Sequence, residues 1–564
     1  MKKKYIDNRD LYEKIIPLPS LILLFLIFLL PLISTLSKAF IYDGKITFSP
    51  FLDLIKTPYT LRILLFTINQ AFFSTLLSLI IALPGAYLLV NYQVKGRKLI
   101  LAICTIPFVL PAILVILGFV TFYGNNGFLN VLLMKIFNLD NPPLKILYSY
   151  KAIIIAHAFY NFPIILVLVT TYWENLDYKL ELSSYVFGAS KLQTFISITL
   201  PRLILSIISS SLLVFLFCFT SFSIILVLGG GPKYTTMEVE IYRRARISMD
   251  LNSAASYALI SIIFCLIILI IYNIFQRKTT TQENIYKSLY KKEKKPVTKI
   301  GLILSILYSI FVILFVLSPI ISIIIKSFLA SNTRSDQSIL TLKWYKQLFG
   351  LSSTTGIMKS SFISIINSLK IALIVAILST PMALSLAIAS KRDHFKSSIL
   401  VELLAMLPLA VSSVIIGLGY YLISARLKSS GGLLLVILAH LVIVLPFNIR
   451  AITPEIRKLP PSLKNSAMTL GASGFRAFID IEVPLLKSSL ISGAIFAFAI
   501  SMGEVNATLI LSSSSIVTIP VTMYRLIGSY NFGGACALGT ILIIVCAIVF
   551  ISSEYMKNDN KVYI

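Results

Sequence analysis

Long apolar segments separated by short polar ones dominate the pattern along this chain. Most of these segments reach about 20 residues, the length that an α-helix needs to cross the roughly 30 Å hydrocarbon layer of a bilayer. The apolar runs are continuous and do not alternate with polar residues, which excludes a β-barrel. We therefore expect an all-α polytopic membrane protein with twelve spans: Ile15 to Leu36, Leu61 to Val90, Leu99 to Phe122, Ala152 to Tyr172, Leu203 to Leu228, Ala255 to Phe275, Ile300 to Ile325, Ile371 to Ser390, Ile399 to Ser424, Leu433 to Ile449, Ser488 to Leu511 and Ala535 to Ser553.

These spans form two sets of six, separated by a polar stretch from Gln276 to Lys299. The stretch carries eight Lys and Arg residues against two Glu residues, and we interpret it as a flexible basic linker in the cytoplasm. The sequence thus predicts a first six-helix module at 1–275, the linker at 276–299 and a second six-helix module at 300–564.

An internal repeat relates the two modules. Four pairs show it: His157 and His440, Pro163 and Pro446, Gly188 and Gly471, and Pro201 and Pro484. The members of every pair are 283 positions apart, as 440 − 157 and 484 − 201 both give. No gap is needed across this region, so one six-span module has been duplicated and fused in parallel.

Composition agrees with a lipid solvent, since 57 % of the 564 residues are hydrophobic and only 13 % are charged. The net charge of +27 sits in short clusters between apolar spans, which indicates membrane topology and lipid headgroup contact and argues against nucleic-acid binding. A cytoplasmic N-terminus places more Lys and Arg residues inside than outside.

All five cysteines lie in apolar runs without the paired spacing of a metal site or a disulfide framework.

The strongest local motif lies between the fourth and fifth spans of each module. It reads GASKLQTFISITLP from Gly188 to Pro201 and GASGFRAFIDIEVP from Gly471 to Pro484, with seven of fourteen positions identical. These segments are too polar to span, so we expect an amphipathic helical hairpin at about 176–202 and another at about 456–487. The glycine permits a sharp reversal and the proline opens the next span. Apolar residues between them supply a docking face: Leu192, Phe195, Ile196, Phe475, Phe478 and Ile479.

On these motifs the chain resembles the permease subunits of binding-protein-dependent ATP-binding-cassette importers of type I. Their cytoplasmic loop has a Gly, an Ile and a Pro at this spacing, and the resemblance covers nearly the whole chain. It implies a bacterial inner-membrane permease with both termini in the cytoplasm, two copies of a separate ATPase subunit that bind ATP and Mg, and an extracytoplasmic substrate-binding protein. The coupling role is carried onto Gly188, Ala189, Ser190, Phe195, Ile198 and Pro201, and onto Gly471, Ala472, Ser473, Phe478, Ile481 and Pro484.

The chain departs from the family pattern at its acidic position, six residues before each glycine. Leu182 and Asn465 stand there, and Glu181 is one place away. The acidic contact to the ATPase is therefore in question in both modules.

A translocation pathway near the membrane mid-plane should be lined by the few polar groups of the spans. Glu504 is the clearest candidate, because an ionised carboxylate at that depth costs roughly 2.5 to 3.5 kcal/mol and should face a cavity or a partner. Asn506 lies beside it, and Ser221 and Ser223 occupy the equivalent positions of the first module. The alternative for Glu504 is a packing carboxylate paired with an Arg or a backbone group. We interpret His157 and His440 as helix–helix hydrogen-bonding groups and not as metal ligands.

No glycine-rich phosphate loop or catalytic constellation is present in the sequence, so this chain is not expected to be an enzyme or to hold a cofactor. Within the importer family, AHAFYNFP, LGGGPKYTTMEVEIY and YGNNGFLN look most similar to thiamine permeases, with iron(III) permeases next. A twelve-helix secondary transporter of the facilitator type is the main alternative. Such a protein would carry an acid in the loop after the second span, where VNYQVKGRK has none.

Overall fold

The computed structural model describes residues 16–42, 44–94, 96–285, 299–331, 338–351, 357–358, 361–390, 404–426, 432–512 and 516–559. Ten helices in this part of the chain are long and apolar enough to cross a bilayer, and two bent helix pairs raise the number to twelve if each pair is one span. The expected all-helical architecture is confirmed, with four short strands in two two-stranded sheets. Most of the predicted linker, 286–298, lies outside the described residues.

The chain folds into two compact units. Unit 1 comprises residues 1–48, 241–258 and 340–564, and unit 2 comprises residues 49–240 and 259–339. These units are defined by contacts in space, whereas the modules 1–275 and 300–564 were defined by sequence repetition. α14 (Met237–Tyr242) and α15 (Leu251–Ile285) contribute residues to both units.

The remaining elements each belong to one unit, apart from β4, whose last residue lies beyond unit 2. Unit 2 contains α4 (Ser49–Lys56), α5 (Pro58–Asn91), α6 (Arg97–Val109), α7 (Ala112–Tyr123), α8 (Phe128–Phe137), α9 (Tyr150–Glu174), α10 (Lys179–Val186), α11 (Lys191–Thr194), η2 (Phe195–Thr199), α12 (Leu200–Phe219), α13 (Ser223–Leu228), η3 (Pro232–Tyr234), α16 (Lys299–Ser327), β3 (Leu329–Ser331) and β4 (Ser338–Leu340). Unit 1 contains α2 (Pro17–Leu24), η1 (Phe25–Leu29), α3 (Leu30–Lys38), β1 (Ile41–Tyr42), β2 (Lys45–Ile46), η4 (Arg243–Ile247), α17 (Lys343–Leu348), α18 (Ser361–Ser390), η6 (Leu407–Ala410), α20 (Ser413–Arg426), α21 (Gly432–Lys458), α22 (Pro461–Thr469), α23 (Gly474–Ala477), η7 (Phe478–Glu482), α24 (Val483–Leu485), α25 (Lys487–Gly503), α26 (Asn506–Leu511), α27 (Ile519–Gly528) and α28 (Phe532–Asp559).

The second, fourth and fifth spans of each sequence half form the core of a unit. In unit 2, α5, α9 and α12 pack against one another, and in unit 1 the equivalent helices α18, α21 and α25 do the same. Val375, Val436 and Ala497 show this packing in unit 1, where they are buried in one cluster. Such all-round apolar helices bury one face on protein and leave the other for lipid.

The first span of each sequence half packs in the unit that is built from the other half. α2, η1 and α3 lie against α18 and α20 in unit 1, and α16 lies against α6 and α7 in unit 2. A glycine permits close approach to a proline in both places, Gly419 to Pro31 and Gly118 to Pro319. Hydroxyl groups add to these contacts, since Tyr420 Oη donates to the Ile27 carbonyl over 2.6 Å. Small residues allow such close packing between membrane helices.

Replacing Gly419 with leucine is expected to detach the first helix and lower the melting temperature of the purified protein by several degrees. A Cβ atom at this position would lie 2.4 Å from the Pro31 carbonyl oxygen, a backbone atom that cannot turn away. Overpacking of this kind costs about 1–3 kcal/mol. Gly528→Leu is the matched control, because no described atom lies within 4 Å of its added Cβ. Equal melting temperatures for the two variants would contradict this account.

Four of the expected spans are broken within the described residues, and the third span of each sequence half is among them. The span expected from Leu99 to Phe122 divides into α6 and α7, because Leu110 precedes Pro111 and adopts an extended conformation with ψ 138°. The span expected from Ile399 to Ser424 is described only from Leu404, and its two helical pieces meet at 102°. Irregular backbone is tolerated inside a membrane only where protein or a cavity surrounds it.

Candidate functional site

The first hairpin, expected at about 176–202, consists of α10, α11 and η2 and has a defined reversal at Gly188. α10 ends there with two closing hydrogen bonds, from Gly188 N–H to the Tyr185 carbonyl and from Ala189 N–H to the Ser184 carbonyl, both over 3.0 Å. Gly188 has φ +83°, a left-handed conformation that glycine adopts without strain. The Ser190 hydroxyl then accepts from Gln193 N–H and begins α11, and the Gln193 side chain accepts from Ser190 N–H.

The second hairpin, residues 461–482, repeats this construction. α22 ends with bonds from Gly471 N–H to the Met468 carbonyl and from Ala472 N–H to the Ala467 carbonyl, both over 3.1 Å. Gly471 has φ +94°, and the Ser473 hydroxyl accepts from Arg476 N–H to begin α23. The motif Gly-Ala-Ser therefore closes one short helix and opens the next in both halves of the chain.

Each hairpin continues toward its span through a five-residue π-helical turn, which in unit 1 is followed by α24 and a 69° bend before α25. The Leu200 N–H donates to the Phe195 carbonyl, and the Val483 N–H donates to the Phe478 carbonyl, five positions back in both cases. Pro201 and Pro484 follow directly; a proline has no N–H and its ring crowds the carbonyl four residues earlier. The wider turn relieves that crowding. The same sequence of π turn and proline occurs at η1, before Pro31.

The structure divides the six residues of the predicted docking face into two groups. Leu192, Ile196, Phe475 and Ile479 are exposed, as expected of a docking surface. Phe195 and Phe478 point inward instead. Phe195 lies 5.9 Å from the Trp173 ring and packs on the core of unit 2, and Phe478 is only 8 % exposed. These two rings anchor the hairpins to their bundles because π-helical residues on one side of the turn face the spans.

Two exposed residues that the sequence interpretation missed stand at the tips of the hairpins. Phe187 and Leu470 immediately precede the two glycines, are 283 positions apart, and are each 89 % exposed. Large apolar side chains at such exposure on a polar loop indicate a contact with a partner. Their common offset and their place before each glycine were visible in the sequence.

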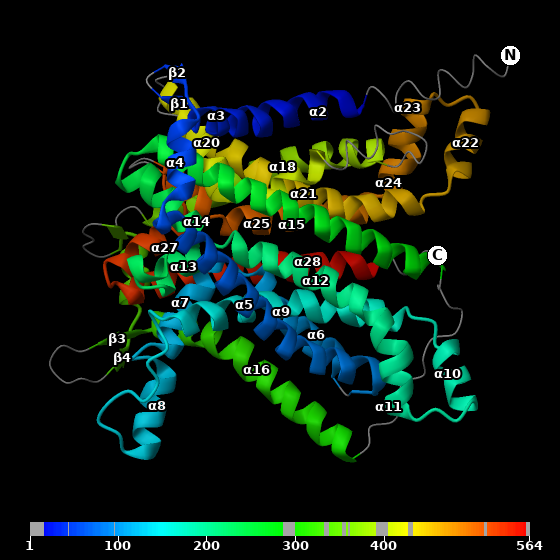
Figure 1. The fold of residues 1–564 in the computed structure, drawn as a ribbon, viewed down its shortest axis with the longest axis horizontal. Helices are drawn as coiled ribbons and strands as arrows, with labels where there is room; N and C mark the ends of the chain where they lie inside the picture. The colour runs from blue at the N-terminus through cyan, green and yellow to red at the C-terminus, as the bar shows by residue number, and fades with distance from the viewer. Residues whose placement is uncertain are drawn as a thin grey trace. The chain divides into compact units, whose positions relative to one another are not determined.

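The remaining coupling residues lie where the hairpin meets its span. Ile198 and Ile481 are half-buried in the π turns, and Pro201 and Pro484 are exposed at the start of the following helices. In each unit the hairpin lies at one end of the bundle, with the loop elements at the other end: α8 in unit 2, and β1 and β2 in unit 1 (Figure 1).

Glu181 is buried inside the first hairpin, where its Oε1 accepts from the Thr199 hydroxyl over 3.1 Å. It thereby connects α10 to the π turn. Partial burial and then the Glu181 carboxylate raise the pKa of Tyr185 above the usual phenol value.

The polar residues predicted to line a pathway lie at matching helix breaks. α12 ends at Phe219 and α13 begins at Ser223, while α25 ends at Gly503 and α26 begins at Asn506. α13 and α26 have bounds that are 283 positions apart at both ends. Glu504 lies in the second break and is 9 % exposed, and its Oε1 accepts from Ala507 N–H over 2.7 Å. This carboxylate therefore caps α26. The Asn506 amide donates to the Ser413 hydroxyl over 2.9 Å.

The two equivalent histidines connect helices through hydroxyl groups, as the sequence predicted. His157 Nε2 lies 2.8 Å from the Ser221 hydroxyl, and its Nδ1 lies 3.2 Å from the Ser74 hydroxyl. His440 has Ser501 and Thr508 as its partners, both at 2.8 Å. Both rings are buried. Among the described residues, no group of three or more His, Cys, Asp or Glu side chains could hold a metal ion.

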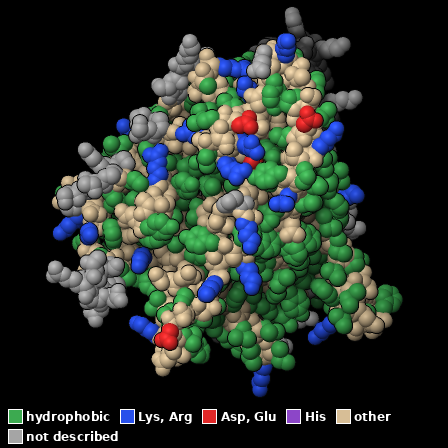
Figure 2. Space-filling view, turned by 60° about the vertical axis from the view of Figure 1, so that its left-hand side comes forward, with side chains coloured by type: hydrophobic (Ala, Val, Ile, Leu, Met, Phe, Trp, Pro, Cys, Tyr) green, Lys and Arg blue, Asp and Glu red, His purple; other side chains and the backbone are tan. Residues whose placement is uncertain are grey.

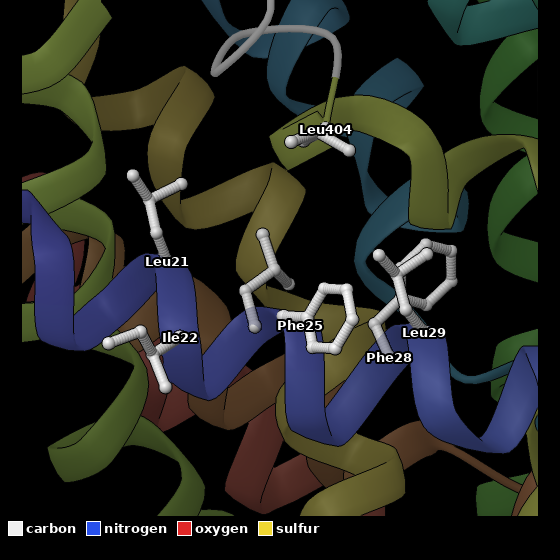
Figure 3. Close-up of a pocket in the computed structure, with 7 residues that line it drawn as sticks. Leu21, Ile22, Phe25, Phe28, Leu29 and Leu404 are labelled. Atoms are coloured by element: carbon white, nitrogen blue, oxygen red, sulfur yellow. The ribbon is translucent and has the colours of Figure 1, made fainter.

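A cavity of about 340 Å³ lies on the first helix of unit 1. Figure 3 shows Leu21, Phe25 and Leu29 along this helix and Leu404 on the facing segment. All seven lining residues are Leu, Ile or Phe. The described side chains of this lining offer a polar solute no hydrogen-bonding group, so we assign no transport role to this cavity.

Comparison with known proteins shows that part of this chain matches a protein family. Residues 74–281 match the family described as "Binding-protein-dependent transport system inner membrane component". This match covers α9, α12, the second half of α5 and the first hairpin.

Similar curated proteins extend over nearly the whole chain. A thiamine transport system permease protein of Haemophilus influenzae is 27 % identical over 498 residues, which cover 87 % of this chain and 88 % of that protein. The thiamine transport system permease protein of Escherichia coli is 23 % identical, over 89 % of this chain and 90 % of that protein. A ferric transport system permease protein of Actinobacillus pleuropneumoniae is 26 % identical, over 96 % of this chain and 78 % of that protein.

Proposed function

We propose that this chain imports thiamine, by means of its two hairpins, as the inner-membrane permease of a binding-protein-dependent ATP-binding-cassette importer. It is the non-catalytic membrane component of the importer, so an ATPase and a binding protein are its partners. Its similarity to thiamine permeases along about 88 % of their length supports thiamine as the solute. Iron(III) is the second candidate, because a ferric permease is 26 % identical over 96 % of this chain.

The two hairpins are the proposed contact with the ATPase. The observation that carries this proposal is their common construction: a left-handed glycine, a serine-capped helix and a π turn before a proline, repeated at an offset of 283. Two matched surfaces on one chain fit two identical ATPase subunits. The exposed tips Phe187 and Leu470 would enter the two ATPase clefts, and the inward rings Phe195 and Phe478 would carry the motion to the spans.

We propose that both hairpins lie in the cytoplasm. With twelve spans, both termini and the stretch 276–299 then lie in the cytoplasm as well. We propose that 1–275 and 300–564 are two six-helix modules joined by this linker. A reporter enzyme that is active only in the cytoplasm, inserted after Phe187, tests the orientation.

The solute is tested with the assembled transporter in liposomes. Thiamine-loaded binding protein is expected to stimulate ATP hydrolysis severalfold above the level with empty binding protein. The same transporter with an iron(III)-loaded binding protein is the comparison. Stimulation by the iron(III)-loaded protein alone would replace thiamine with iron(III), and solute movement without nucleotide or ATPase would contradict the importer function itself.

We propose that Glu504, Asn506, Ser221 and Ser223 face the translocation pathway. Glu504→Gln keeps an acceptor oxygen for the Ala507 N–H and removes the charge, so α26 stays capped. We expect uptake to fall about tenfold while the ATPase still co-purifies. Glu504→Ala loses both the cap and the charge and serves as the comparison. Normal uptake by the glutamine variant, with loss only in the alanine variant, would make Glu504 a structural cap.

A further inference from the structure

A glycine-rich loop in unit 2 brings three aromatic rings together. The loop contains Gly230 and Gly231, with φ +70° and +112°. A Cβ atom on Gly230 would lie 2.6 Å from the Tyr148 Cβ, so only glycine allows the loop to press against the start of α9. The loop is followed by Tyr234, whose ring centroid lies 5.9 Å from that of Phe66 and 6.5 Å from that of Tyr150.

The three rings form a half-exposed surface that we call the aromatic platform: Phe66, Tyr150 and Tyr234. The Phe66 and Tyr150 centroids are also 5.9 Å apart, so all three rings touch one another and leave no space between them for a solute. The Tyr150 hydroxyl donates to the Asn69 side-chain oxygen. The platform is therefore a rigid, nearly continuous surface and not a pocket.

Each ring of the platform has a cation close to it in the chain. Arg62 lies one helical turn before Phe66, Lys151 follows Tyr150, and Lys233 precedes Tyr234 with its ammonium 5.4 Å from that ring centroid. All three cations are exposed. We call them the basic rim.

The surface around the platform, at the end of unit 2 opposite the hairpin, is also positively charged. In 49–66, 124–151 and 229–240 the exposed charged residues are six Lys or Arg (Lys56, Arg62, Lys135, Lys145, Lys151 and Lys233) and two Asp (Asp53 and Asp140). Figure 2, which brings forward the loops at the left of Figure 1, shows Lys and Arg side chains outnumbering Asp and Glu on that face. Aromatic and Arg side chains are enriched in protein interfaces, whose rim is polar and solvent-accessible.

We propose that the aromatic platform and its basic rim are a docking surface for an acidic patch on the extracytoplasmic binding protein. This inference rests on the proposed function, which places this end of unit 2 outside the cell, opposite the hairpin. The basic rim increases the rate of encounter with an acidic partner, and the rings hold the docked partner by burying apolar area. The glycines are required because they place Tyr234 on the platform.

The test measures association and dissociation of the solute-loaded binding protein on the full transporter in nanodiscs of zwitterionic lipid. The triple variant Arg62→Glu, Lys151→Glu, Lys233→Glu is expected to associate about tenfold more slowly than wild type at low salt. This deficit should shrink at 0.5 M salt, where charges are screened over only a few ångströms. Tyr234→Ala is expected to dissociate about tenfold faster with a nearly unchanged association rate.

The control is a second triple variant, Lys56→Glu, Lys135→Glu, Lys145→Glu, which changes the net charge equally but away from the rings. It should associate no more than about threefold more slowly. Equal losses in the two triple variants, or unchanged kinetics in the rim variant and in Tyr234→Ala, would overturn the proposal. Basal ATP hydrolysis without binding protein should equal that of wild type in every variant if only docking is affected. Solute uptake by the wild-type complex without nucleotide would instead argue against the importer function.

Discussion

Replacing Gly188 and Gly471 together with valine is expected to reduce solute uptake to less than a tenth of the wild-type rate while the protein still inserts in the membrane. Both glycines have positive φ, +83° and +94°, and no described atom lies within 4 Å of an added Cβ. The substitution therefore destabilises the hairpin through its backbone. An L-amino acid in the left-handed region raises the conformational energy by about 1–2 kcal/mol per residue, and a β-branched residue raises it more. The reversal would change direction and the exposed tips would leave their positions.

Two comparisons isolate this effect. Asparagine tolerates the left-handed conformation better than other residues with a side chain, so Gly188→Asn with Gly471→Asn should keep most of the uptake. Gly350→Val introduces the same strain at φ +71° and in equally open surroundings, but in a loop outside the hairpins, and should transport normally. If the double valine variant transported solute like wild type, the hairpins would not be the coupling elements.

Replacing Phe187 and Leu470 together with aspartate is expected to release the ATPase from the permease without unfolding it. Each side chain is 89 % exposed in the free chain, so its loss removes little folding energy. Burying one such side chain in a partner contributes about 1.5–3 kcal/mol, which corresponds to roughly ten- to a hundredfold in affinity per hairpin. The affinity of the purified permease for the ATPase measures this.

Leu351 provides the control for the tips, because it is 76 % exposed and lies outside the hairpins. Leu351→Asp should bind the ATPase normally. The single variants Phe187→Asp and Leu470→Asp should each retain partial binding, because one hairpin remains intact. An undiminished affinity in the double variant would exclude the tips from the contact.

The sequence predicted the membrane-spanning helices because they depend on local composition. Apolar length determines where a helix can cross lipid, and the 283-residue offset reappears in the structure at η2 and η7 and at α13 and α26. The reversal at the two glycines was also predictable, since few other residues adopt a positive φ at a helix end.

Other features depend on packing that no local pattern shows. An apolar residue in a short amphipathic segment can face either a partner protein or its own helix bundle. Phe195 and Phe478 lie at the start of the two π turns and face their own bundles. The role of Glu504 in capping α26 required the break after Gly503 to be known. The aromatic platform joins residues from α5, η3 and α9 that are far apart in the chain.

The placement of the two first helices has a consequence for the origin and assembly of this chain. α3 meets its partner α20 across nearly 400 positions, and α16 meets α7 across about 200. A half-length protein with this packing could not cover its own third span, and would have to exchange its leading helix with a second copy. A fusion of two such copies would join both exchanged helices in a single polypeptide. A cut between α15 and α16 should accordingly yield two fragments that are each degraded when made alone and protected when made together.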